Sequence, residues 1–176
     1  MFGYCRKTGI AILLALFNLP VSATYLYQVN EVFFENPFKG ISKIAVNIKY
    51  LSEDPYHALK DRERITKSSL ESEIEQKLNN AGFEVISLDT AESDPDVVYL
   101  DLEYHINLLY QLIYTYDMKA SVRQKFKLPN GEGAYLTVKT WSEGRVGGTS
   151  QSGLGKIRTY THELVDNFIQ AYHAQN

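Results

Sequence analysis

Apolar and polar residues alternate along four stretches of this chain, and apolar residues recur every three to four positions along two others. Strict alternation is typical of a strand with one buried face, and the wider spacing is typical of a helix with one buried face. The pattern predicts strands at 44–50, 96–108, 116–128 and 134–142, and helices at 66–81 and 157–173. It also predicts a short strand at 83–88.

The first predicted helix has clear ends. Thr66 is a suitable N-cap, and Ile65 and Leu70 are spaced to contact each other across it. Gly82 follows the last apolar position, where helices commonly end in a left-handed glycine. Each helix has a single apolar stripe, so we expect both to pack on a sheet.

The strands also have one apolar face each, which favours a sheet that is covered on one side. We expect an α+β fold: a two-layer sandwich with a mainly antiparallel sheet of about four to five strands and two helices on one face. The predicted order is β-α-β-β-β-β-α. Residues 24–176 are expected to form a single domain, and the Gly-rich stretch 144–155 a loop before the last helix.

Residues 1–23 have the features of an export signal. Basic residues precede an apolar run, Gly9 to Phe17, and Val21-Ser22-Ala23 offers the small-x-small pattern that signal peptidase recognises. The run is about half the roughly 20 residues that span a bilayer. We expect cleavage by signal peptidase I, a bacterial periplasmic or secreted protein that begins at Thr24, and no transmembrane segment in the mature protein.

The cysteine content and charge limit the classes of partner. The single cysteine, Cys5, lies before the apolar run, so it is not placed for lipid attachment or for a disulfide in the mature chain. The formal net charge of −3 becomes more negative without Arg6 and Lys7. A net negative charge disfavours binding to nucleic acid and disfavours anionic lipid as a general partner. No motif indicates a cofactor.

The connection between the two longest predicted strands is the most unusual segment. Hairpin connections normally carry Gly, Asn, Asp or Pro, but this one is apolar and aromatic, which is typical of contact surfaces. It is a candidate docking tip for a protein, lipid or peptide; alternatively, it folds back over the sheet end or packs under residues 24–41. The candidate binding residues are Leu109, Tyr110, Leu112, Ile113 and Tyr114.

Trp141 is a further binding candidate. Alternation places it with Tyr135 and Lys139 on the polar face of its strand, where it could stack on a sugar or peptide. A small bulge in the strand would instead turn the ring inward.

Asp101, Glu103 and His105 occupy every second position of one strand face, where carboxylates and an imidazole could ligate a metal or share a proton. The alternative is ordinary charge pairing. If the hairpin pairs near residues 111–113, Arg123 and Lys119 fall opposite the two acids.

The order of elements over about residues 40–176, and the ending Glu163-Leu164-Val165-Asp166-Asn167-Phe168-Ile169-Gln170-Ala171-Tyr172, resemble small exported bacterial envelope proteins of unassigned function. The β-α-β-β-β module is similar to the N-terminal domain of the Tol-system propeller protein and to auxiliary proteins of lipid-transport systems. The chain lacks the lipidated cysteine of those auxiliaries, which argues against a membrane tether.

The sequence therefore favours a non-enzymatic accessory or binding protein of the bacterial envelope that engages a protein or other envelope component through the apolar hairpin. Two alternatives remain open. One is a small exported metal-dependent enzyme that uses Asp101, Glu103 and His105, and the other is a soluble carrier of an apolar ligand.

Overall fold

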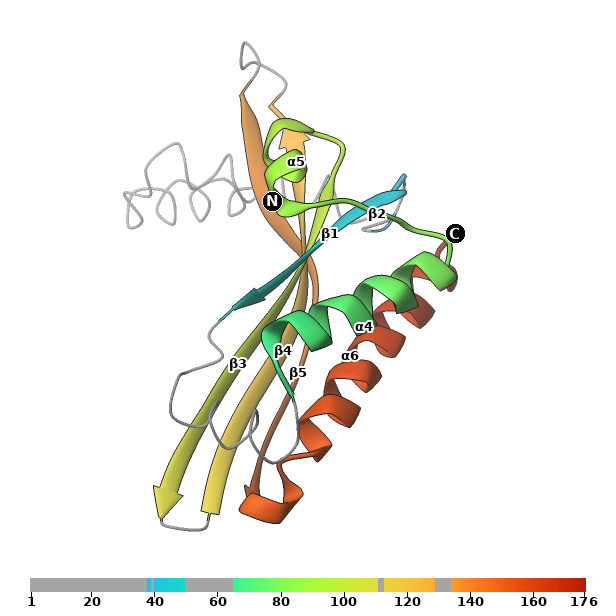
Figure 1. Cartoon of the computed structure of the whole chain (residues 1–176). Helices are drawn as coiled ribbons and strands as arrows, with labels where there is room; N and C mark the ends of the chain where they lie inside the picture. Colours follow the sequence, from blue (N-terminus) through green and yellow to red (C-terminus); the bar gives the residue numbers. More distant parts are fainter. Residues whose placement is uncertain (1–37, 39, 50–64, 111–112, 129–133) are drawn as a thin grey trace, which may run out of the picture. The chain divides into compact units, whose positions relative to one another are not determined.

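The computed structural model describes residues 38, 40–49, 65–110, 113–128 and 134–176 (Figure 1). The predicted export signal and the turn expected at 129–131 lie outside these residues, so both stay predictions, as does the single domain over 24–176. The elements along the described chain are β1 (Lys43–Lys49), α4 (Lys67–Asn80), β2 (Glu84–Val85), α5 (Leu88–Ser93), β3 (Val98–Tyr110), β4 (Ile113–Lys127), β5 (Tyr135–Ser150), the 3₁₀ helix η1 (Gln151–Gly153) and α6 (Lys156–His173).

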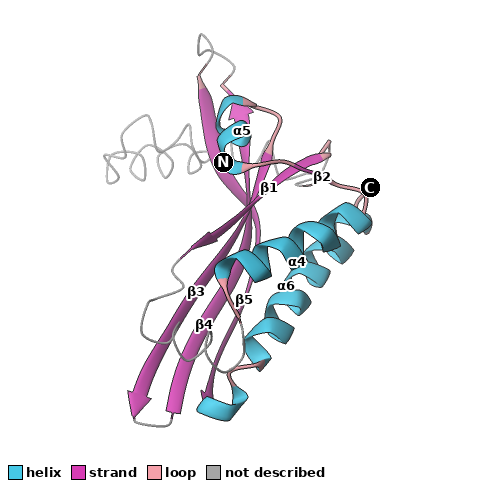
Figure 2. Cartoon of the chain, viewed as in Figure 1, coloured by secondary structure: helices cyan, strands magenta, loops and turns pink. Residues whose placement is uncertain are grey.

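The strands form one mixed sheet in the order β2-β1-β3-β4-β5 (Figure 2). β1 pairs in parallel with β2 and β3; α4 connects β1 to β2, and α5 connects β2 to β3. The long strands β3, β4 and β5 pair antiparallel. The α+β class is confirmed, and the predicted order of elements holds with α5 and η1 added.

The ends of α4 follow from its sequence, as expected. The Thr66 side chain accepts a hydrogen bond from the Ser69 backbone N–H at 3.0 Å, and the Ser69 hydroxyl accepts one from the Thr66 N–H at 3.0 Å. This reciprocal pair satisfies two donors that a helix start otherwise leaves open. Gly82 ends the helix with a φ of 94°, which a residue with a Cβ rarely adopts.

The main core lies between the sheet and the helices α4 and α6. It combines alternate residues of β1, β3 and β4 with buried helix residues such as Leu70, Ile74 and Phe168. One polar contact crosses it: the hydroxyls of Tyr104 on β3 and Thr161 on α6 lie 3.0 Å apart, and Thr161 also donates to the Ile157 carbonyl at 2.8 Å. Burial raises the pKa of Tyr104, so the hydroxyl stays protonated there.

The opposite face of the sheet is covered at one end by α5, which the sequence pattern did not predict. Ala45, Ala91, Val97 and Tyr99 form a second small cluster there. The predicted strand at 83–88 is only two residues long, because the chain turns into α5, whose N-cap Ser87 accepts from the Thr90 N–H at 3.3 Å. The expectation of a single covered face therefore holds only beyond α5.

The loop predicted at 144–155 is wrong for residues 144–150, since β5 continues to Ser150; the connection to α6 is only residues 151–155, which include η1. The glycines of β5 accommodate the neighbouring strand. A Cβ at Gly147 would lie 2.7 Å from Cζ of Tyr116, and a Cβ at Gly144 would lie 3.2 Å from the Met118 carbonyl oxygen. Glycine here permits close approach of side chain and backbone rather than a flexible connection.

Candidate binding surface

The β3–β4 hairpin ends in exposed apolar side chains. Leu108 is 52% exposed, Leu109 is 58% exposed and Ile113 is 49% exposed. The register shifts between Leu108 and Tyr110, so Leu109 occupies a bulge. We call Leu108, Leu109 and Ile113 the apolar tip. Of the other predicted binding residues, Leu112 and the side chain of Tyr110 lie outside what the structure describes.

Tyr114 does not belong to the apolar tip. Its side chain is 6% exposed and is part of the main core. Because β4 begins at Ile113, consecutive residues point to opposite faces, and Tyr114 points toward the helices while Ile113 points away from them. The sequence pattern placed the strand start at 116 and so treated both residues as part of the connection.

The helix-covered core closes just before the tip. The rings of Tyr116 on β4 and Tyr160 on α6 lie 5.6 Å apart, and the guanidinium of Arg145 on β5 lies 4.3 Å from the Tyr160 ring centroid. Burial and the neighbouring Tyr160 hydroxyl raise the pKa of Tyr116. Arg145 also pairs with Glu163 at 2.7 Å. These contacts belong to the core wall, and the apolar tip lies beyond them.

The predicted acidic row takes part in charge pairing. Glu103 lies opposite Lys119 in the β3–β4 register, and His105 lies opposite Asp117. The Asp101 side chain is 1% exposed and is surrounded by hydrogen-bond donors. Asn47 Nδ2 lies at 2.8 Å, Lys49 Nζ at 2.9 Å and Arg123 Nη2 at 2.9 Å. Arg123 Nε also donates to the carboxylate. Charge pairing was the predicted alternative to a metal site. Lys119 lies opposite Glu103 as expected, whereas Arg123 lies opposite Tyr99 and reaches Asp101 diagonally.

The electrostatics of Asp101 follow from this surrounding. Burial acts to raise its pKa, but hydrogen bonds and ion pairs with Arg123, Lys49 and Asn47 outweigh burial and hold the pKa below its ordinary value. The same contact raises the pKa of Arg123. Among the described residues, no group of three or more His, Cys, Asp or Glu side chains is placed to hold a metal ion.

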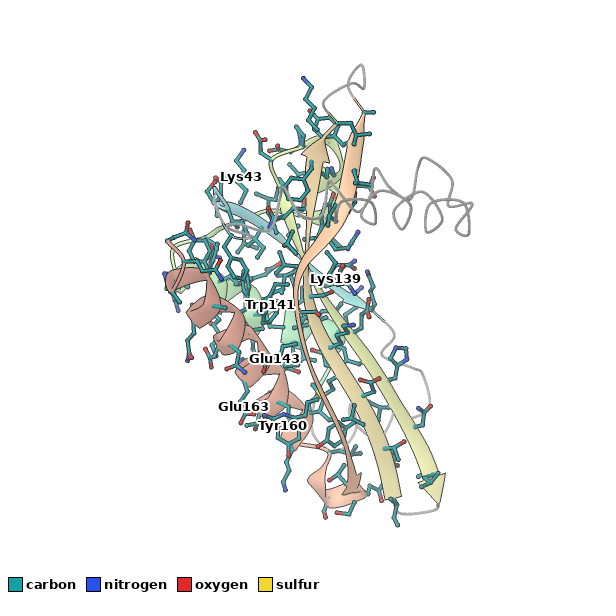
Figure 3. All side chains as sticks on the ribbon, turned by 180° about the vertical axis from the view of Figure 1, so that it is seen from behind. Lys43, Lys139, Trp141, Glu143, Tyr160 and Glu163 are labelled. Carbon is teal, nitrogen blue, oxygen red and sulfur yellow. The ribbon has the colours of Figure 1, made fainter. Side chains whose placement is uncertain are left out.

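Trp141 faces the helices. The β4–β5 register shifts at this point: Arg123 lies opposite Lys139 but Val122 lies opposite Trp141, which leaves Thr140 as the extra residue of a bulge. The Trp141 ring lies 5.6 Å from the Phe168 ring on α6, and Figure 3 shows it on the α6 side of β5. The inward alternative is the one observed, and Trp141 packs against the core.

One exposed apolar residue was missed from the sequence. Val146 on β5 is the most exposed large hydrophobic residue in the described chain. It lies opposite Asp117, on the face away from α6. The only available signal was the alternation of residues 141–150, which the glycines obscure because they have no side chain to assign to a face.

Comparisons with known proteins identify no family. No protein-family model matches the chain, and no curated protein matches it significantly. None of the described helices combines the length and apolar character needed to cross a bilayer.

Three solved structures of bacterial lipoproteins show limited similarity to the chain. A minor lipoprotein from Acinetobacter baumannii is 13% identical, with a TM-score of 0.32, over 74% of this chain and 86% of the other. A lipoprotein from Neisseria meningitidis is 15% identical, with a TM-score of 0.34, over 73% and 98%. The rare lipoprotein B from Shewanella oneidensis is 15% identical, with a TM-score of 0.20, over 75% and 89%.

Proposed function

We propose that this chain is a non-enzymatic accessory protein of the bacterial envelope, periplasmic or secreted, that binds a partner through the apolar tip. The observation that supports binding is the exposure of Leu108, Leu109 and Ile113 at the end of a hairpin. Large apolar side chains that gather on a surface mark contact sites more often than those that occur singly. Export rests on the sequence of residues 1–23, and the resemblance to the Tol-system propeller protein stays a prediction.

The metal-dependent alternative has less support. Asp101 would have to exchange its contacts with Arg123 and Lys49 for a cation. This exchange would leave Arg123 without its ion pair and Lys49 with only the longer contact to Glu103, at 3.8 Å. The acidic row is better explained as the charge balance of the outer sheet face.

The tip can be tested by photo-crosslinking in the producing bacterium. A photoreactive residue replaces Leu109 in one variant and Tyr135 in a control, because Tyr135 is also exposed but lies at the other end of β5. We expect a defined protein or lipid adduct at position 109 and none at 135. In a second variant, Leu108→Ser with Ile113→Ser should remove the adduct.

The circular dichroism spectrum of that variant should match wild type, and its free energy of unfolding should change by no more than about 0.5 kcal/mol, because both residues are exposed. An adduct that persists in the serine variant, or equal adducts at 109 and 135, would contradict the proposal.

A further inference from the structure

The apolar tip lies in a part of the chain without acidic residues. No Asp or Glu occurs in residues 104–116, at the end of β3 and the start of β4, or in residues 144–162, at the end of β5 and the start of α6. The second range contains Arg145, Lys156 and Arg158. The whole chain, in contrast, has 21 acidic and 18 basic residues. These two ranges are thus basic within an acidic protein.

The two acid-free ranges meet in space. Ile113 of β4 lies opposite Ser150 of β5, and η1 leads from Ser150 to the start of α6 (Figure 1). Two of the cations there are engaged: Arg158 pairs with Glu73 at 3.3 Å, and Arg145 pairs with Glu163. Lys156, the first residue of α6, is exposed.

We propose that this end of the molecule docks on an anionic phospholipid bilayer, with the apolar tip inserted at the headgroup boundary and Lys156 near the lipid phosphates. The inference rests on the proposed function, because it names the partner of the same tip. Interfacial binding needs apolar side chains together with nearby cations. A specific protein interface of ordinary size buries about 800 Å² on each partner, more than the three described side chains of the tip supply.

The negative charge of the whole chain does not oppose this contact. Attraction to an anionic surface acts within a Debye length, about 8 Å at physiological salt. Asp117 is four strand residues from Ile113, about 13 Å at the strand rise, and Glu103 is six residues from Leu109, about 20 Å. The nearest acids of β3 and β4 therefore lie more than one Debye length from the tip. Arg145 lies opposite Met118, one residue farther than Asp117, so Lys156 is the cation on which the proposal depends.

Co-sedimentation with vesicles tests the proposal. The full chain, as its host processes it, is mixed with phosphatidylcholine vesicles or with vesicles that also contain about a third phosphatidylglycerol, and the partition coefficient is measured. We expect binding to the anionic vesicles, and a loss of at least about tenfold in Leu108→Ser with Leu109→Ser, because two apolar side chains no longer enter the lipid. Lys156→Gln should lose about fivefold on anionic vesicles and nothing on neutral ones.

Tyr135→Ser is the matched control, since it removes an exposed apolar residue far from the tip. Its partition should equal that of wild type. Any contribution from residues 1–37 is common to all variants, so the differences between variants report on the tip. A fluorophore on Ile113→Cys, in a Cys5→Ser background, should shift to the blue with anionic vesicles, whereas one on Tyr135→Cys should not.

Two results would overturn the lipid inference: no binding of wild type to anionic vesicles, or equal binding of wild type and the tip variant. If position 109 then still crosslinks to a protein in cells, the proposed function stands with a protein partner. If both the vesicle binding and the adduct at 109 are absent, the proposed function fails as well.

Discussion

The two ends of β3 reverse the usual distribution of residues. Near the start of the strand, the charged residue Asp101 is buried, and near the other end the apolar residues Leu108 and Leu109 are exposed. The difference lies in the contacts. Asp101 is held by Arg123, Lys49 and Asn47 and so contributes to the fold, whereas Leu108 and Leu109 lie beyond the core wall formed by Tyr116 and Tyr160. A buried charge with its partners indicates a structural role, and exposed apolar residues indicate a contact.

Removal of Asp101 should have the largest effect on stability. In Asp101→Ala, the cations Arg123 and Lys49 lose their common carboxylate, and we expect the free energy of unfolding to fall by about 3 kcal/mol. That value is at the lower end for buried pairs because both cations are partly exposed to water. Urea unfolding measures the change.

Asp117→Ala is the control, since Asp117 is an exposed carboxylate on the same face of the sheet. It should change stability by no more than about 0.5 kcal/mol. Equal effects of the two substitutions would show that burial does not distinguish these sites.

The same contact predicts a pH dependence. Because the pKa of Asp101 is lowered in the folded state, its contribution to stability is complete above the unfolded pKa of about 3.9 and is lost as the pH falls through the folded pKa. The difference in unfolding free energy between wild type and Asp101→Asn should therefore be constant from neutral pH to about pH 5 and shrink below pH 4. A difference that grows toward acid would contradict the assignment.

A smaller effect is expected at Gly147, which tests whether the helix side stays packed close to the tip. Gly147→Ala should lower stability by about 1–2 kcal/mol, because its Cβ would overlap the buried Tyr116 ring. Gly148→Ala is the matched control: its Cβ would meet only the Tyr114 carbonyl oxygen at 3.6 Å. Thermal unfolding of the pair gives the result, and equal stability of the two variants would show that the ring moves aside.

The serine substitutions in the apolar tip complete this series with the smallest expected change in stability. If they lowered stability as much as Gly147→Ala, the tip residues would be part of the core and the contrast between the two ends of β3 would disappear.

For the acidic row Asp101, Glu103 and His105, part of the arrangement could be predicted from the sequence and part only from the structure. The pairing of Glu103 with Lys119 across the strands could be anticipated, because a hairpin register follows from where its connection lies, whereas Arg123 lies opposite Tyr99 and reaches Asp101 diagonally. The burial of Asp101 could not be anticipated. It depends on Asn47 and Lys49 from β1, a strand more than fifty residues earlier, and sequence periodicity does not report contacts over that separation.

The candidate binding surface shows the same division. The absence of turn residues between 108 and 116 indicated an unusual tip, and the exposed Leu109 and Ile113 agree with that expectation. The inward positions of Tyr114 and Trp141 were set by the start of β4 and by the bulge at Thr140. Both depend on how neighbouring strands pair, so no local pattern determines them.

The sequence by itself determined the caps of α4, the apolar stripes of α4 and α6, and the alternation of β3 and β4, because local hydrogen bonds and periodic burial are encoded within a few residues. Only the tertiary structure decided the course of β5 and the position of α5. Gly147 and Gly144 of β5 accommodate Tyr116 and Met118 on the next strand, and α5 is held by Tyr99, whose hydroxyl donates to the Ala91 carbonyl at 2.8 Å. Contacts between distant segments, rather than local preference, select these parts of the fold.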